Sequence, residues 1–297
     1  MSRFIILLLV SFIAQAAIAQ HKEVSITIDD IPNVHVYKQH AFSSPLLNQI
    51  NELKLPVAIF INERNVHLNE FEKENRQGLV KWLTNKNITP GNHSYSHLNY
   101  SDTNLAAFKE DVEKGAIITK ETIKKNPKYF RFPYNSMGND SAAHHQVKAY
   151  IKEMGYVNAP FTIESEDWAF NSSYEVALRN NDAEKAKQIG ESYLTYTLQL
   201  FDYFERICKE LYGRNIKHIY LCHDSPLNTD YLGELIKRLK HNGYSFISLD
   251  EALKDKVYQS KDYYTGRLGF SWIYRWQPDE TKRKALMKQE PINESLR

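Results

Sequence analysis

Short β-branched segments alternate with helical patterns along this chain, and this alternation most constrains its fold. Helical spacing of apolar residues follows the strand-like segments 24–28 and 57–61, and the pattern continues through the chain. The expected strands are 24–28, 57–61, a short one ending at the histidine pair 93/97, 129–132, 156–159, 218–222 and 244–247. Among the helices, one is expected from about 101 to about 125, and a long one, or two in succession, over 182–212 with Gly213 as the C-terminal stop. Strands that alternate with helices run parallel. We therefore expect an α/β fold, a distorted, incomplete (β/α) barrel of about seven parallel strands.

The first residues have the features of a secretory signal. Met1-Ser2-Arg3 precedes the apolar run 4–13, and Ala17-Ile18-Ala19 supplies an A-x-A end. We expect residues 1–19 to be a signal peptide cut after Ala19; the alternative is an uncleaved membrane anchor, for which the run is short. No cysteine lies near the cut, which argues against a lipid anchor. The expected location is secreted or periplasmic, with no stable membrane insertion.

Charge and cysteine content exclude several classes of partner. Lys+Arg number 38 against Asp+Glu 36, which gives no electrostatic case for binding nucleic acid or an anionic membrane. No protein partner is inferred.

The two cysteines are not expected to form a disulfide. Cys208 lies near the end of an expected helix and Cys222 lies on an expected strand, which places their Cα atoms too far apart for a bond, so two free, buried thiols are expected.

Polar residues stand where the expected strands end. Each group alone has an ordinary explanation, such as helix capping or a surface ion pair. In β/α barrels, however, the loops after the strands lie at one pole and carry the chemistry. The five groups are Asp29-Asp30, His93 with His97, Arg131 to Tyr134, Asp167-Trp168 and Leu221-Cys222-His223.

The histidine pair is a candidate metal site. His93 and His97 would lie on one side of a single helical turn, and zinc–imidazole bonds of roughly 2.0–2.1 Å would let one ion bridge them. A carboxylate must complete such a site. Asp29 and Asp30 are adjacent strand residues that normally point to opposite faces, so both can reach it only if the strand curls at its end.

These groups together resemble the motifs of the polysaccharide deacetylases, carbohydrate esterase family four, with the chitooligosaccharide deacetylase homology domain. Residues 27–30 resemble T-F-D-D, 93–97 match H-[ST]-x-x-H, 131–134 match R-x-P-Y, 164–168 are similar to D-[AS]-x-D-W, and 221–223 match L-x-H. The five motifs occur in family order from about Val24 to Leu253. Four positions depart from the family pattern and place the shape of the substrate pocket in question: Ile28, Ile31, Asn135 and Glu164.

The resemblance implies a metal site and a base. Asp30, His93 and His97 would bind a divalent ion, with zinc the first choice and cobalt or another divalent ion as alternatives. Asp29 would take the proton of the attacking water, and Arg131 would hold the Asp29 carboxylate.

The resemblance also assigns the other half of the reaction. His223 would protonate the leaving group, and Asp167 would fix its tautomer. The backbone N–H of Tyr134 would stabilise the oxyanion. Trp168 and Leu221 would form an apolar wall around the acetyl methyl group.

The chain is therefore expected to be a metal-dependent hydrolase that removes acetyl groups from a glycan. Peptidoglycan, chitooligosaccharide and O-acetylated xylan are all compatible substrates. No G-x-S-x-G motif supports a serine esterase. The alternative is a non-catalytic carbohydrate-binding protein on a degenerate barrel, although binding alone would need neither a general acid nor a base.

The remaining polar and aromatic residues are expected to be structural. We expect a catalytic domain over 20–255 and an aromatic-rich extension over 256–297 that packs on the barrel. The alternative for this extension is sugar binding: if residues 270–276 were extended, their four aromatic rings would share one face and could stack on sugar rings. His144 and His145 are expected on a solvated helix face, and Asp224 is expected to cap the next segment.

Overall fold

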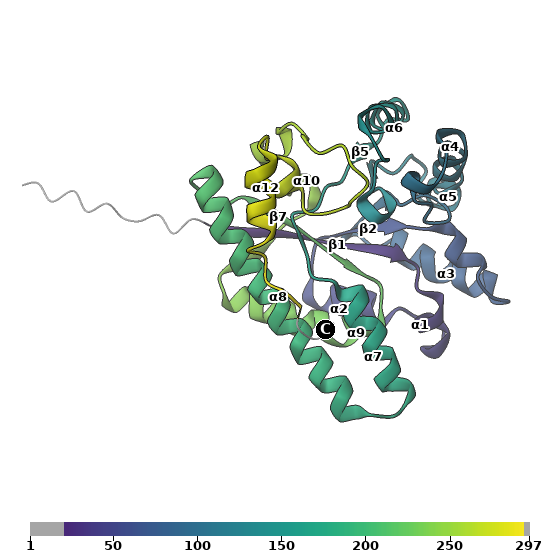
Figure 1. The fold of residues 1–297 in the computed structure, drawn as a ribbon. Coiled ribbons are helices and arrows are strands. Elements are labelled where there is room, and N and C mark those ends of the chain that lie inside the picture. Colours follow the sequence, from purple (N-terminus) through teal and green to yellow (C-terminus); the bar gives the residue numbers. More distant parts are fainter. Residues whose placement is uncertain (1–20, 294–297) are drawn as a thin grey trace, which may run out of the picture.

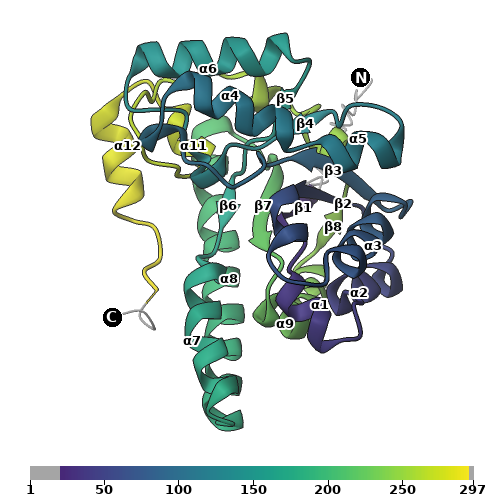
Figure 2. The ribbon, with the colours of Figure 1, turned by 90° about the vertical axis from the view of Figure 1, so that its right-hand side faces the viewer.

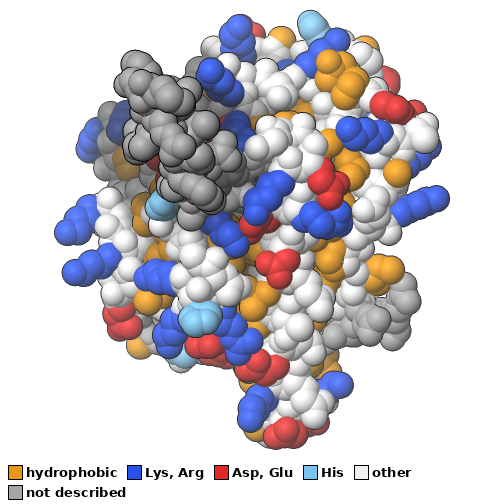
Figure 3. All heavy atoms as spheres, turned by 90° about the vertical axis from the view of Figure 1, so that its left-hand side faces the viewer, with side chains coloured by type: hydrophobic (Ala, Val, Ile, Leu, Met, Phe, Trp, Pro, Cys, Tyr) orange, Lys and Arg blue, Asp and Glu red, His pale blue; other side chains and the backbone are white. Residues whose placement is uncertain are grey.

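The computed structural model describes residues 21–293 (Figure 1). The expected signal peptide lies outside these residues. Within them, no helix is both long and apolar enough to cross a membrane. On the face drawn in Figure 3, acidic side chains are scattered among the more numerous basic ones.

The centre of the fold is one sheet of parallel strands. Its order is β5-β4-β3-β2-β1-β7-β6, and β8 also pairs with β1. Within the described residues β5 and β6 do not pair, so the sheet is an open, curled half-barrel, which confirms the expected fold class. The strands are β1 Lys22–Ile31, β2 Val57–Ile61, β3 Ile88–Asn92, β4 Tyr129–Phe130, β5 Val157–Asn158, β6 Ile163–Glu164, β7 Lys217–His223 and β8 Tyr244–Phe246.

Strand β1 organises the sheet because it is long enough to pair with three neighbours. One edge bonds to β7 along seven residues. The other edge bonds to β8 through Lys22–Val24 and then to β2 from Ile26 onward. All seven expected strands are present. Strand β6, only two residues long, was not predicted, because two residues are too few to carry a periodic pattern.

Helices cover the outer surface of the curled sheet (Figures 1 and 2). The long pattern over 182–212 forms a single helix, α8, that ends at Gly213 in the left-handed conformation, as expected from the glycine. The helices are α1 Val34–Gln39, α2 Pro45–Leu53, α3 Glu72–Leu83, α4 Leu105–Lys114, α5 Ile117–Ile123, α6 Ser141–Glu153, α7 Asp167–Arg179, α8 Ala183–Tyr212, α9 Pro226–His241, α10 Leu249–Ala252, α11 Trp272–Arg275 and α12 Glu280–Met287.

One expected helix is divided in the structure. A continuous helix to about residue 125 was expected, but α4 ends at Lys114 and α5 begins at Ile117. Gly115 lies between them against the loop after β3, where a Cβ atom would come within 2.6 Å of the Ser94 carbonyl carbon. The break lets the chain pass close to the loop that carries the histidine pair.

The C-terminal segment packs on the sheet but is not extended. Residues Trp272–Arg275 form the short helix α11, so the alternating aromatics do not line one face of a strand. The Trp272 N–H donates a hydrogen bond to the Phe161 carbonyl (3.1 Å). Further along, the Tyr203 hydroxyl of α8 donates to the Leu286 carbonyl of α12 (2.6 Å), and the two helices lie side by side in Figure 1.

A buried ion pair holds this segment in place. Arg275 is fully buried and bonds to Asp262 at 2.8 Å, and Asp262 also accepts a bond from Lys148 of α6. Replacing Asp262 with alanine would leave the Arg275 charge buried without its partner. We expect Asp262→Ala to lower the free energy of unfolding by about 3–5 kcal/mol in chemical denaturation.

Arg267 provides the matched control. It pairs with Asp102 at 3.0 Å, and both side chains are more than half exposed. Arg267→Ala should change the free energy of unfolding by no more than about 1 kcal/mol. Equal effects of the two substitutions would contradict the structural role of the buried pair.

Candidate active site

The strand ends surround one pocket of about 500 Å³. All five groups of polar residues meet there, although they are spread over nearly two hundred positions of sequence. Arg131 and Asp167 lie behind Asp29 and His223, to which they bond. The lining residues are Asp29, Asp30, His93, His97, Tyr134, Asn135, Phe161, Glu164, Trp168, Asn171, Leu221, His223, Asp224, Ser225 and Gly269.

The two adjacent aspartates reach the same pocket because the backbone turns at Asp30. Its φ of 65° is left-handed, and the register of β1 against β2 shifts between Ile28 and Ile31. A regular strand would send Asp29 and Asp30 to opposite faces. The left-handed turn at Asp30 is the expected curl at the end of the strand, and it brings both carboxylates to the pocket. Aspartate tolerates this conformation better than most residues.

Asp30, His93 and His97 converge on one point. The Asp30 Oδ1 atom lies 3.7 Å from His93 Nε2 and 3.6 Å from His97 Nε2, and candidate ligand atoms of the three residues lie within 4.8 Å of one another. The expected helical turn is absent. The histidines lie instead on an irregular loop in which Ser94 and His97 both have left-handed backbones, with φ of 63° and 60°.

The chemistry of these three side chains fits a divalent ion. Asp30 Oδ1 is buried and has no hydrogen-bond partner in the described part of the chain, as expected for an oxygen that binds a cation. The Nδ1 atom of His93 lies 2.8 Å from the Arg131 carbonyl, which leaves Nε2 to face the site. Burial, aided by repulsion from His97, lowers the pKa of His93 to about 3, so its imidazole is neutral as a metal ligand must be.

Asp29 is held from behind by Arg131. Arg131 is fully buried, and its Nη1 donates to Asp29 Oδ1 at 2.7 Å and to the Thr27 hydroxyl at 2.8 Å. The guanidinium also lies over the Phe60 ring, 4.1 Å from the ring centroid. This arrangement leaves Asp29 Oδ2 facing the site, 3.6 Å from His93 Nε2.

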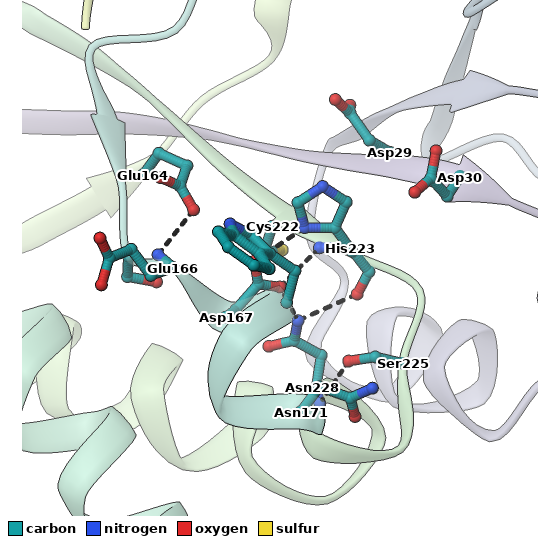
Figure 4. A network of polar contacts seen from close by, with 12 residues as sticks. Asp29, Asp30, Glu164, Glu166, Asp167, Asn171, Cys222, His223, Ser225 and Asn228 are labelled. Carbon is teal, nitrogen blue, oxygen red and sulfur yellow. Dashed lines mark hydrogen bonds and ion pairs between the residues drawn. The ribbon is translucent and has the colours of Figure 1, made fainter. Parts of the chain in front are cut away.

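His223 is oriented by Asp167, which begins α7. Asp167 Oδ1 lies 2.7 Å from His223 Nδ1, while Oδ2 accepts bonds from the His223 N–H and from Asn228 (Figure 4). Burial alone would lower the pKa of His223, but the bonded Asp167 carboxylate, together with the charges of Asp30 and Asp29, outweighs it and raises the pKa to about 10. The imidazole is therefore charged at neutral pH.

Glu164 adds a neutral carboxyl group to the same wall. Burial, together with the nearby Asp167 charge, raises the pKa of Glu164 to about 8. One of its oxygens accepts a bond from the Glu166 N–H at 2.6 Å (Figure 4). At neutral pH the side chain therefore carries a proton that it can donate in a hydrogen bond, a property that the sequence motif alone does not indicate.

Aromatic side chains form the mouth of the pocket. Tyr134 and Trp168 are more than half exposed there, and Leu221 is buried in its wall. The sequence pattern did not identify several other lining residues. Asn171 lies one helical turn after Trp168, so helical spacing could have indicated it, whereas Phe161 and Gly269 carry no local signal.

Two expectations about polar residues were wrong. His144 is buried rather than solvated, because its Nε2 contacts the Gly266 carbonyl of the C-terminal segment at 3.0 Å. Asp224 does not cap the following helix; Ser225 does. Asp224 instead accepts bonds from the Asn33 N–H and the Tyr37 hydroxyl. The expectation of two free, buried thiols at Cys208 and Cys222 is confirmed.

Sequence comparisons find similarity to polysaccharide deacetylases. Residues 17–159 match the family profile described as "Polysaccharide deacetylase". A peptidoglycan-N-acetylglucosamine deacetylase of Bacillus cereus is 23% identical over 146 residues, which cover 49% of this chain and 46% of that protein. YheN of Bacillus subtilis, assigned to the polysaccharide deacetylases, is 25% identical over 78% of this chain and 68% of its own. An uncharacterized protein of Geobacillus stearothermophilus is 26% identical over 61% of this chain and 57% of its own. The chain thus spans only about half the length of this protein and of the Bacillus cereus relative.

The fold is also found among solved structures. A CE4 family pseudoenzyme from Bacillus anthracis superposes with a TM-score of 0.52 at 18% identity, covering 78% of this chain and 66% of that one. At this identity the likeness concerns the fold alone.

The pair of Asp167 and His223 gives a test of the site's electrostatics. Asp167→Asn removes the charge that favours the imidazolium but leaves the ring buried. We expect the pKa of His223 to fall from about 10 to below about 6.5, measured by NMR titration of the metal-free protein.

Asp230→Asn makes the same change on the exposed side of α9, where Asp230 bonds to Tyr174. It should leave the His223 titration unaltered. A His223 pKa that stays near 10 in Asp167→Asn would show that another group sets it.

Proposed function

This chain belongs to the polysaccharide deacetylase family, and from that premise we propose that it is a metal-dependent hydrolase that removes acetyl groups from a glycan. The observation that carries the proposal is the meeting at one pocket of two aspartates, two histidines that could hold a metal ion together with Asp30, and a charged third histidine. Simple sugar binding needs no such set of acid, base and metal ligands. The alternative, a non-catalytic carbohydrate-binding protein, would leave these groups without a use.

The proposed metal ligands are Asp30, His93 and His97, with zinc as the first choice and cobalt or another divalent ion as alternatives. An ion held there would supply Lewis-acid polarisation of the acetyl carbonyl. Asp29 is the proposed base: its free Oδ2 faces the site and would take a proton from the attacking water. Arg131 fixes the orientation of the Asp29 carboxylate through Oδ1.

The proposed acid is His223, which would pass its Nε2 proton to the departing amine or alcohol. Its Nδ1 is bound to Asp167, so only the other ring nitrogen can serve. The backbone N–H of Tyr134 is the proposed donor to the oxyanion. Trp168 and Leu221, which line the pocket, would form an apolar wall around the acetyl methyl group.

The proposed substrate is an acetylated glycan outside the cytoplasm, after cleavage of the signal peptide. The Bacillus cereus relative is named for peptidoglycan N-acetylglucosamine, and this supports an N-acetylated glycan as the first candidate. Chitooligosaccharide and O-acetylated xylan are the alternative substrates. Acetate release from these three substrates, measured with zinc and with cobalt, identifies which one is used.

The first prediction separates the base from the metal ligands. Asp29→Asn keeps the size of the side chain but removes its basicity, so we expect kcat to fall roughly 10²–10⁴-fold while bound metal, measured by elemental analysis, stays near the wild-type level. Wild-type rates of acetate release from Asp29→Asn protein would overturn the assignment of the base.

The second prediction concerns the metal ligands. His97→Ala removes one of three ligands, so the purified protein should lose bound metal and acetate release together, as should wild-type protein treated with a chelator. His145→Ala is the matched control, because His145 is exposed on α6 outside the pocket. Full metal content in His97→Ala would contradict the proposed ligand set.

A further inference from the structure

The turn that carries Tyr134 has a strained backbone. Tyr134 and Asn135 are consecutive residues with φ of 56° and 50°, both in the left-handed region. Such conformations cost on the order of 1–3 kcal/mol each for residues other than glycine and persist only when neighbouring structure holds them. Something outside the turn must therefore keep it in this shape.

The C-terminal segment 266–272 lies against this turn. At Gly269 a Cβ atom would come within 1.8 Å of the Tyr134 carbonyl oxygen and within 2.8 Å of Asn135 Cβ. The nearest of these atoms belongs to the backbone and cannot rotate away as the end of a side chain would. Gly269 also lines the pocket itself. Only a residue without a side chain can occupy this position while the turn keeps its shape.

The segment is fixed on both sides of Gly269. On the N-terminal side, the Gly266 carbonyl contacts the buried His144 ring at 3.0 Å. On the C-terminal side, the Ser271 hydroxyl donates to the Thr162 carbonyl at 2.7 Å, and the Trp272 N–H donates to the Phe161 carbonyl at 3.1 Å. Because both flanks are bonded to the body of the protein, a side chain at 269 would displace the Tyr134 turn rather than the segment.

We propose that Gly269 is a positioning residue of the active site, which sets the place of the Tyr134 turn through the segment 266–272. The inference rests on the proposed function, in which the Tyr134 N–H stabilises the oxyanion. The turn also contacts the metal site, since the Tyr134 and His97 ring centroids lie 4.6 Å apart. The C-terminal extension thereby forms part of the catalytic pocket, although it lies about a hundred residues beyond the stretch that matches the family profile.

Gly269→Ala tests the proposal through the separation of kcat from KM. A displaced oxyanion donor weakens binding of the transition state more than binding of the ground state. We expect kcat for acetate release from the preferred glycan to fall roughly 10–100-fold, with KM changed less than about threefold. The protein should still unfold cooperatively, because the clash is relieved by movement of one partly exposed turn and leaves the core packing unchanged.

Leu268→Ala is the matched control on the same segment. The Leu268 side chain is more than half exposed, and it does not line the pocket. Its kcat and KM should equal those of the wild type. A Gly269→Ala protein with the same kcat as this control would overturn the positioning role while leaving the proposed function intact.

A second substitution distinguishes positioning from general damage. Asn135→Gly removes the Cβ that residue 269 would meet and makes the left-handed turn easier to adjust. In the Gly269→Ala background we expect Asn135→Gly to recover kcat by at least about threefold. Strictly additive effects would overturn the coupling between the two positions. Wild-type protein inactive on every glycan of the panel would instead overturn the proposed function, and with it this inference.

Discussion

The left-handed backbone at Asp30 is the constraint on which the site depends. It ends the regular part of β1 and turns a second carboxylate toward the pocket already occupied by the first. In an ordinary strand one of the two acids would face the helices outside the sheet. The curl allows Asp29 and Asp30 to take different surroundings within one pocket: Asp29 is buried against Arg131, and Asp30 lies between two imidazoles.

The pocket holds histidines in opposite charge states, and the cause differs for each. His93 is neutral because burial and repulsion from His97 disfavour its charged form and together outweigh the attraction of Asp30. His223 is charged because Asp167, which bonds directly to Nδ1, and the nearby charges of Asp30 and Asp29 together outweigh the same penalty. Two identical side chains in one pocket thereby suit the two different tasks proposed for them, metal ligand and proton donor. Neutral Glu164 beside them follows the same rule, since burial favours its uncharged form.

The pocket is assembled from parts of the chain with very different sequence signals. Asp29, Asp30, His93, His97 and Arg131 lie within the stretch that matches the family profile, whereas Asp167, His223 and Gly269 lie beyond it. The later residues are placed by β7, by the start of α7 and by a segment after the last strand. The parallel sheet joins these parts, because β7 pairs with β1 in a register that sets Asp29 opposite His223.

The sequence by itself determined the parallel α/β architecture and the polar groups at its strand ends, because hydrophobic period and motif order are local properties. It did not determine the irregular loop of the histidines, the division of the helix at Gly115, the burial of His144 or the contact of Gly269 with the Tyr134 turn. Each of these depends on which distant backbone comes to lie beside the residue. Only the closed packing of the tertiary structure decides such neighbours, since no nearby spacing in the chain encodes them.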